Sequence, residues 1–466
     1  MERRKEPILS RLEPVQKLRG VLVKRAGEFI EAARVDLGKS PGEVLGGDLL
    51  PLAEACKFLC SRARKILASR RCSRSPIWLG DQQWVCRIPF GVVGIIGTWN
   101  YPIFLSGVQI LHALVAGNSV VWKPSEVAPQ SARVLESALR EAGFGPDRLV
   151  VLPTDREYGA WLCDQEIDFL VFTGSEKIGR AIAAKLSQKL IPSVLELSGV
   201  DPLIVLEDCH DLDLARKAIW YGIRSNSGQT CIAPRRLFIH RSHYEAILAP
   251  LRGKISNEVP LPLATAGQIT VARSIIEDAK AKNATITGGT FAEVNGKSGM
   301  QPLLIETERT DLLASREACF APLAVAIPFD HLDDLPELLG TTSFSLAGSV
   351  FAGDVDDGLE LGPLLDSGLV SVNDVIVPVA HPDAPVGGRG TSGWGVTQGE
   401  EGLLAMTRPM VLSIRKGQFR PHYDYSWSGN DHRDDLYNLF RISHASGLME
   451  KLKGIWSLVT RGKGPF

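Results

Sequence analysis

The sequence carries almost no net charge and lacks the cysteine arrangements of metal-binding and secreted proteins. Its 466 residues have a formal net charge of -1, so we expect no basic surface for nucleic acid. The 8 cysteines form no C-x-x-C pair and no cluster with histidine at zinc spacing, so we expect no metal site. The first residues, MERRKEPILS, lack the apolar core of a signal peptide. These absences predict a cytoplasmic protein with free thiols.

One stretch lacks charge altogether and raises the question of a membrane span. Residues 88–122 contain no Lys, Arg, Asp or Glu over 35 positions, whereas a spanning helix needs roughly 20 apolar residues. Prolines, glycines and asparagines interrupt the run. Parallel strands that are buried on both faces produce runs of this kind. We therefore expect a buried core and not a span.

The order of apolar segments predicts an α/β fold. Amphipathic helices come first, and strand, loop and helix then alternate through two successive blocks. A chain of this length exceeds what one ordinary core holds. We expect doubly wound, mostly parallel sheets.

The dinucleotide fingerprint G-x-G-x-x-G is absent, but two strand ends could hold a nucleotide. In FTGSEKIG, backbone N–H groups at a helix start and the Ser175 hydroxyl could receive a phosphate oxygen. In WKPSE, Glu126 could bind ribose hydroxyls and Lys123 a hydroxyl or a phosphate. The alternatives are a plain strand-to-helix turn and a surface ion pair. Two such sites on one sheet make a nucleotide more plausible than either site does alone.

Three residues suggest covalent catalysis. Cys231, in SNSGQTCIAP, lies between a helix and a strand, where its sulfur could open into a pocket, although most free cysteines are small buried hydrophobes. Glu196, in VLELSG, ends an apolar strand, where a charge is costly unless it is used or paired. Asn100, in TWNYP, follows another strand, and its amide could donate to an oxyanion. The nearest histidines, His210 and His240, lie in no stretch that marks them as partners of the cysteine.

These segments resemble the NAD(P)-dependent aldehyde dehydrogenases over about residues 89–410. The matching motifs, in order, are TWNYP, KPSE, FTGSEKIG, LELSG, SGQTC, ACFAP and VGGRGTSGWG. SGQTC with an upstream LELSG is highly specific. GTWNYP and GQTCIAP are most similar to the class 3 branch, which acts on fatty and aromatic aldehydes.

The resemblance implies oxidation of an apolar, medium- or long-chain or aromatic aldehyde to a carboxylic acid. Cys231 would attack the aldehyde, while the Asn100 amide and the Cys231 N–H hold the oxyanion. After hydride transfer leaves a thioester, Glu196 would activate the water that hydrolyses it.

The resemblance also implies NAD or NADP as cofactor. Lys123 and Glu126 would bind the adenosine ribose, which favours NAD, and Ser175 would lie at the pyrophosphate. The implied cofactor-binding residues are Thr98, Trp99, Lys123, Ser125, Glu126, Gly174, Ser175 and Phe320.

One motif departs from the family. Where the family usually has E-E-x-F-G-P, this chain has EACFAP. Phe320 keeps its place, but Ala318 replaces the glutamate that holds the nicotinamide ribose, and Ala321 replaces glycine. We expect a looser nicotinamide and slower hydride transfer.

The resemblance implies two Rossmann-like domains, a small β arm that forms a homodimer, and a tail. The expected boundaries are 1–78 and 90–200 for the NAD(P)-binding domain, 201–404 for the catalytic domain, 79–89 and 405–420 for the oligomerisation strands, and 421–466 for the tail.

The tail contains an amphipathic pattern. Its apolar residues at helical spacing are Leu448, Met449, Leu452, Ile455, Trp456 and Val459, and its basic residues are Lys451, Lys453, Arg461 and Lys463. One interpretation is peripheral contact with an anionic membrane surface. The other is packing on the protein itself or on a partner subunit.

Three other functions stay open. A CoA-acylating reductase is disfavoured by Glu196, a base that this branch usually lacks. A catalytically degenerate member is favoured by Ala318 and disfavoured by the intact Cys231. A cysteine hydrolase would need no nucleotide. Tyr101, Phe104 and Leu105 indicate an apolar tunnel for the aldehyde, although such residues are as often core.

Overall fold

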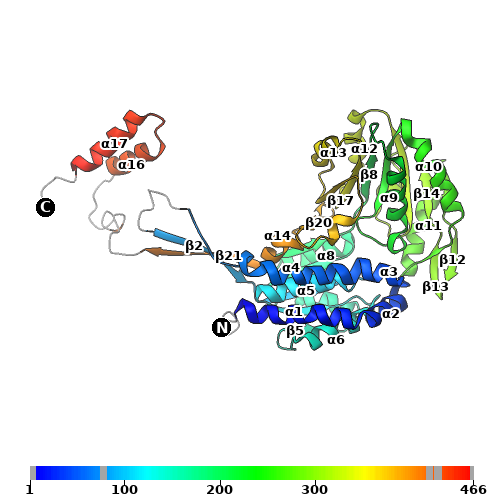
Figure 1. Cartoon of the computed structure of the whole chain (residues 1–466), viewed down its shortest axis with the longest axis horizontal. Helices are drawn as coiled ribbons and strands as arrows, with labels where there is room; N and C mark the ends of the chain where they lie inside the picture. Colours follow the sequence, from blue (N-terminus) through cyan, green and yellow to red (C-terminus); the bar gives the residue numbers. More distant parts are fainter. Residues whose placement is uncertain (1–6, 74–80, 416–422, 424–432, 462–466) are drawn as a thin grey trace. The chain divides into compact units, whose positions relative to one another are not determined.

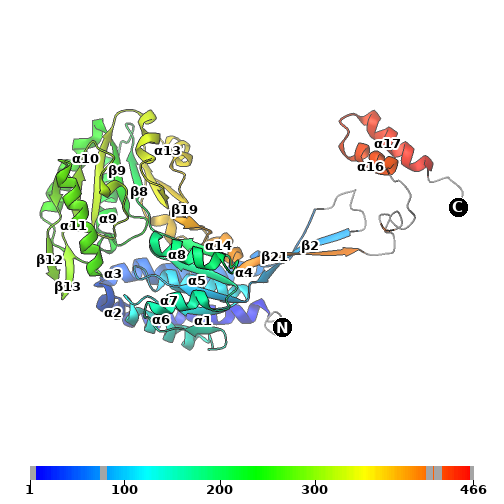
Figure 2. The ribbon, with the colours of Figure 1, turned by 180° about the vertical axis from the view of Figure 1, so that it is seen from behind.

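The computed structural model describes residues 7–73, 81–415, 423 and 433–461, and the chain forms two compact units (Figures 1 and 2). The main unit comprises Met1–Leu67 and Pro89–Arg408. The arm unit comprises Ala68–Ile88 and Pro409–Phe466. Both strand–helix blocks expected from the sequence lie in the main unit, and each is built on its own sheet.

The main unit starts with a block of helices. They are α1 (Ile8–Lys24), α2 (Ala26–Leu37), α3 (Pro41–Val44), the π-helix η2 (Leu45–Leu49) and α4 (Leu50–Ile66). Apolar residues three or four positions apart, such as Val15, Leu18 and Leu22, form the buried face of α1. At the start of α3, Ser40 and Glu43 form a capping box.

The first sheet has six strands in the order β20-β7-β6-β3-β4-β5. Their bounds are β3 (Val92–Ile96), β4 (Ser119–Lys123), β5 (Leu149–Val151), β6 (Phe169–Thr173), β7 (Ser193–Glu196) and β20 (Gly393–Trp394). Its helices are α5 (Phe104–Ala116), α6 (Pro129–Ala142), α7 (Glu157–Asp164) and α8 (Glu176–Ser187). All neighbouring strands are parallel except β20, which is antiparallel to β7. The carboxyl ends of the parallel strands therefore share one edge.

The uncharged run of residues 88–122 supplies the centre of this sheet. It contains β3, α5 and β4, and every residue of α5 is buried. In the described part of the chain no helix is both long and apolar enough to cross a membrane. The predicted buried core is confirmed.

The second sheet has seven strands in the order β11-β14-β15-β9-β8-β17-β18. Their bounds are β8 (Asp201–Val205), β9 (Pro234–His240), β11 (Thr285–Gly288), β14 (Leu303–Glu306), β15 (Leu323–Phe329), β17 (Ala347–Phe351) and β18 (Leu369–Val372). Only β11 runs antiparallel to its neighbour. Helices α9 (Leu212–Arg224), α10 (Arg241–Ser256) and α11 (Ala266–Ala281) lie beside this sheet (Figures 1 and 2). The predicted α/β fold with two doubly wound sheets is confirmed.

Short elements complete the main unit. A small sheet joins β10 (Leu261–Pro262), β13 (Lys297–Met300) and β12 (Phe291–Val294), and a second pairs β16 (Phe344–Ser345) with β19 (Arg389–Gly390). The remaining α-helices are α12 (Leu335–Leu339), α13 (Val355–Leu361) and α14 (Gly399–Ala405).

In its described residues, the arm unit holds a three-stranded sheet and two helices. The strands are β1 (Arg70–Arg71), β2 (Asp81–Pro89) and β21 (Thr407–Arg415). Strands β2 and β21 lie within the two segments expected to form oligomerisation strands, and residues 79–80 and 416–420 of those segments lie outside the described residues. The helices are α16 (Arg433–His444) and α17 (Leu448–Arg461), and the sequence pattern had indicated only the second. The six apolar tail residues lie on α17, and all of them are exposed. Lys463 lies outside the described residues.

A buried ion pair ties the helical block to the first sheet. Lys39 Nζ lies 2.7 Å from Asp48 Oδ2, and the two side chains are 1% and 0% exposed. Asp48 Oδ1 accepts the N–H groups of Ile103 at 3.3 Å and Phe104 at 3.1 Å. These donors begin α5, where no residue of the helix itself caps them. Asp48 thus acts as an N-cap supplied from another helix.

Replacing Asp48 with alanine is expected to lower the free energy of unfolding by about 3–5 kcal/mol, because the buried Lys39 charge loses its partner. Urea denaturation followed by circular dichroism measures this change. Glu54→Ala is the matched control, because its pair with Lys57 is 49% and 60% exposed and such pairs contribute about 1 kcal/mol or less. Equal stability of the two variants would contradict the structural role of Asp48.

Candidate active site

The predicted nucleophile, Cys231, follows a turn whose backbone is left-handed at three successive residues. After α9, the 3-10 turn η4 (Ser225–Gly228) has φ values of 50° at Asn226, 54° at Ser227 and 70° at Gly228. A Cβ on Gly228 would lie 2.4 Å from the Ala321 backbone, so only glycine fits there. We call residues 225–231 the catalytic loop.

Cys231 is half-buried and lines a cavity. Burial, and then the negative charge of Glu196, raise the pKa of this thiol above its ordinary value. The free site therefore holds a neutral thiol, which needs a base or a bound cation to become a nucleophile.

Asn100 lies against the catalytic loop and has one amide proton to spare. Its Oδ1 accepts a hydrogen bond from Thr98 Oγ1 at 2.8 Å, and its Nδ2 donates to the Gln229 carbonyl at 3.0 Å. The Gln229 carbonyl can only accept a hydrogen bond, so it fixes which end of the amide carries the donors. An amide nitrogen has two N–H groups, so the second can serve a developing oxyanion.

Glu196 is almost completely buried at the end of β7. Burial raises its pKa to about 7, although the hydroxyls of Thr173 and Thr397 act in the opposite direction. Gln109 Nε2 donates to Thr173 Oγ1 at 2.8 Å, which leaves the threonine proton for the carboxylate. A carboxyl group with a pKa near neutrality suits a general base. Sequence reasoning missed Gln109, Thr173 and Thr397, because none stands out in its own segment.

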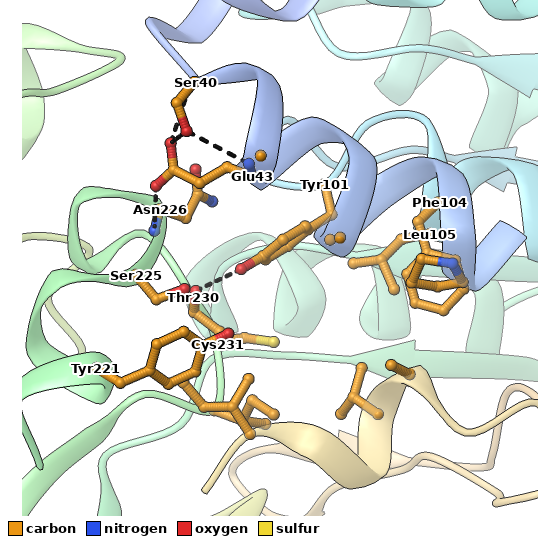
Figure 3. A pocket seen from close by; sticks show the side chains of 18 residues that line it. Ser40, Glu43, Tyr101, Phe104, Leu105, Tyr221, Ser225, Asn226, Thr230 and Cys231 are labelled. Atoms are coloured by element: carbon orange, nitrogen blue, oxygen red, sulfur yellow. Dashed lines mark hydrogen bonds between the residues drawn. The ribbon is translucent and has the colours of Figure 1, made fainter. Parts of the chain in front are cut away.

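The cavity at Cys231 has a volume of about 530 Å³ and mostly apolar or small lining residues (Figure 3). Tyr101, Phe104 and Leu105 all line it, as the sequence predicted. The Tyr101 hydroxyl lies 2.7 Å from Thr230 Oγ1, which joins the TWNYP segment to the catalytic loop. The other lining residues are Ser40, Gly42, Glu43, Gly46, Gly47, Pro51, Tyr221, Ser225, Asn226, Ile232, Ile376, Val379 and Ala380.

Sequence reasoning also missed Glu43, which reaches the catalytic loop from α3. Its Oε1 accepts the Asn226 N–H at 3.1 Å, and its Oε2 accepts the Ser40 N–H at 2.9 Å (Figure 3). A capping box was the only available signal, and it predicts a helix start and nothing more.

The residues proposed to hold a nucleotide follow β4 and β6, which flank β3. Lys123 Nζ lies 3.3 Å from Glu126 Oε2, and Arg156, which the sequence did not indicate, lies 2.5 Å from Glu126 Oε1. Ser175 is the N-cap of α8, and its side chain makes no capping bond to the helix. A cation, a carboxylate and a helix N-terminus along one sheet edge fit a dinucleotide.

The remaining predicted cofactor residues lie on the same segments or on the EACFAP loop. Gly174 lies between β6 and α8, and Ser125 follows β4. The rings of Trp99 and Phe320 are 5.8 Å apart. The Phe320 carbonyl accepts a hydrogen bond from Gln268 Nε2.

Comparison with known proteins shows which family this chain is similar to. A family model described as "Aldehyde dehydrogenase family" matches residues 2–412. A 4,4'-diapolycopene aldehyde oxidase from Methylomonas sp is 32% identical over 474 residues, covering 99% of this chain and 86% of that protein. A probable coniferyl aldehyde dehydrogenase from Pseudomonas aeruginosa is 30% identical, with 85% of each chain covered. The NAD+ complex of a Mycobacterium tuberculosis aldehyde dehydrogenase superposes with a TM-score of 0.83 at 26% identity, covering 90% of this chain and 87% of that one.

Glu196→Gln is expected to stabilise the folded protein at pH 8. The Glu196 pKa is about 7 in the folded protein and near 4.5 in the unfolded chain, so above pH 7 the fold must bury a charge. The gain at pH 8 is on the order of 3 kcal/mol. It shrinks as the pH decreases and is lost below about pH 4.5, where both states bind the proton.

Thermal denaturation of wild type and variant between pH 5 and pH 8 measures this difference. Glu54→Gln, at an exposed position, serves as the control. A gain of the same size at every pH would show that the Glu196 carboxyl is not buried as described.

Proposed function

Because the chain belongs to the aldehyde dehydrogenase family, we propose that it oxidises an apolar, medium- or long-chain or aromatic aldehyde to the carboxylic acid. NAD or NADP is the hydride acceptor. One observation carries this proposal: Cys231 lines an apolar cavity, on a loop whose Gln229 carbonyl accepts the Asn100 amide, and the charge of the buried Glu196 acts on its thiol.

In the first half of the proposed reaction, the Cys231 sulfur bonds to the aldehyde carbon. The thiol proton passes to bulk water, directly or by way of Glu196, which is left as the carboxylate. The free Asn100 N–H and the Cys231 backbone N–H stabilise the oxyanion. Bound NAD or NADP supplies the acceptor for the hydride from that carbon. A thioester remains on Cys231.

In the second half, Glu196 removes a proton from a water molecule, whose oxygen attacks the thioester carbon. The carbon–sulfur bond breaks, the acid leaves, and the Cys231 sulfur takes the proton from Glu196, which returns to the carboxylate. In the carboxylate form, which predominates above pH 7, Glu196 is ready for this step.

The cofactor would be held by the residues at the shared sheet edge. Lys123 and Glu126 would bind the adenosine ribose, and the α8 N-terminus with Ser175 would face the pyrophosphate. Trp99 and Phe320 would flank the nicotinamide. The family's second ribose-binding carboxylate is absent at Ala318, which would loosen the ring and slow hydride transfer.

Two features of the cavity favour a long or flat apolar aldehyde. Glu43 is the one charged residue among those that line it, and both its oxygens are engaged by backbone N–H groups. Gly42 and Gly46, four residues apart, also line the cavity. A Cβ added at either position would meet no atom within 4 Å, so the cavity is wide there. Two relatives are named for a 4,4'-diapolycopene aldehyde and for coniferyl aldehyde.

We extend the proposal to the assembly. Strands β2 and β21 would form the contact of a homodimer, which light scattering in solution tests. The exposed apolar residues of α17 would lie against the partner subunit, and co-sedimentation with anionic vesicles would instead reveal the membrane contact that its basic residues permit.

Turnover is expected with hexanal, decanal and benzaldehyde, recorded as NADH or NADPH absorbance, and higher kcat/KM for the longer chain. Cys231→Ala should lower kcat by a factor on the order of 10³ or more, because the nucleophile is lost. Cys72→Ala is the control for removal of a free thiol outside the cavity. If no aldehyde is oxidised while NAD still binds, the chain is a degenerate member. If turnover appears only with CoA, the reaction is acylating.

Gly46→Leu should lower kcat/KM for decanal relative to propanal by about tenfold or more, because a side chain at this position enters the cavity. A Cβ at this position meets no atom within 4 Å, and glycine is a poor helix former, so the fold tolerates the change. Gly20→Leu in α1, which is also unobstructed but lies outside the cavity, is the matched control. An unchanged ratio would show that long aldehydes do not pass Gly46.

A further inference from the structure

The conformation of the catalytic loop is unfavourable for the residues that occupy it. Asn226 and Ser227 both have left-handed backbones, and both carry side chains. Such residues persist only where the surrounding structure holds them, and they gather at functional sites. The contacts on this turn therefore bear directly on the position of Cys231.

Two of these contacts come from the loop itself. The Asn226 carbonyl accepts hydrogen bonds from the Gln229 backbone N–H at 2.9 Å and from Gln229 Nε2 at 3.0 Å. Arg235, on β9, donates to the Gly228 carbonyl. These interactions hold the carbonyl side of the turn.

The N–H side of the turn is held from a distant part of the chain. Glu43 Oε1 accepts the Asn226 N–H at 3.1 Å across 183 residues of sequence. The second carboxylate oxygen is fixed by the Ser40 N–H at 2.9 Å and the Ser40 hydroxyl at 2.8 Å. The acceptor therefore stays in place whether or not the loop is bound to it.

The side chain of Asn226 also contacts the segment that carries Asn100, the proposed oxyanion donor. Its Nδ2 donates to the Asn100 carbonyl at 3.0 Å and to the Gln229 carbonyl at 3.2 Å. The Asn100 amide donates to the same Gln229 carbonyl. Asn226 thus bridges the donor segment and the loop that carries the nucleophile.

We propose that Glu43 is a positioning residue of the active site. Its carboxylate holds Asn226 in the left-handed conformation, and through Asn226 it fixes the Asn100 amide relative to Cys231. The effect on catalysis rests on the proposed aldehyde oxidation, whereas the effect on the loop does not.

Kinetics of Glu43→Ala with propanal test the catalytic effect. We expect kcat to fall by about tenfold or more and KM to change by less than about threefold, because alignment is lost and the cavity remains. Adding Ser227→Gly, which removes one of the unfavourable left-handed residues, should restore kcat by about threefold or more. Glu54→Ala, in the exposed ion pair with Lys57, is the matched control.

Hydrogen–deuterium exchange of the peptide that spans residues 225–231 tests the hold on the loop without any substrate. Glu43→Ala should speed exchange of this peptide by about tenfold, whereas Glu54→Ala should not. Wild-type kcat in a folded Glu43→Ala variant would overturn the proposal, as would a fall in kcat that Ser227→Gly does not reverse. If wild type oxidises no aldehyde, the proposed function fails, and unchanged exchange in Glu43→Ala still decides against the positioning role.

Discussion

The active site depends on a buried ion pair far from it in sequence. Lys39 and Asp48 lie in the helical block, and Asp48 holds the first N–H groups of α5, the helix that follows the TWNYP segment. Lys39 also lies 4.1 Å from the centre of the Tyr101 ring. Between these two residues stands Glu43, which binds the catalytic loop. A ten-residue stretch thus contacts both the segment of the proposed oxyanion donor, Asn100, and the loop of the proposed nucleophile, Cys231. Neither charge of the pair is tolerable alone at this burial, so the stretch has little freedom to move.

The cost of burying a charge also explains why the proposed general base, Glu196, destabilises the fold. Glu196 lies among apolar strands, where water cannot solvate its charge, and burial raises its pKa to about 7. An exposed glutamate would be stable but too weak a base, since its pKa would be near 4.5. Thr173, oriented by Gln109, supplies one hydrogen bond and so limits the shift. The buried Glu196 carboxyl therefore lowers the stability of the folded protein at neutral pH, and the same burial gives this carboxylate a higher basicity than an exposed one.

Much of the site could be predicted from the sequence, because parallel strands end at one edge. Asn100, Lys123, Ser175 and Glu196 each follow an apolar strand, and the topology then brings those strand ends together. Glu43, Gln109 and Asp48 act through contacts across 183, 64 and 55 residues. Each lies on a helix, and its local pattern indicates only helix. Likewise α16 was missed because its apolar residues follow a polar, aromatic segment without a clear start signal.

Two glutamines, Gln268 and Gln229, connect the loop that carries Ala318 to Asn100 through hydrogen bonds. Gln268 donates to the Phe320 carbonyl and, at 3.0 Å, to Gln229 Oε1. The Gln229 carbonyl in turn accepts from Asn100. The aromatic wall of the expected nicotinamide site is therefore connected to the oxyanion donor through hydrogen bonds that do not involve residue 318. Loss of a carboxylate there removes a ribose contact but leaves Phe320 in place. It follows that Ala318 should affect how firmly the cofactor is held and not how the aldehyde is bound or attacked.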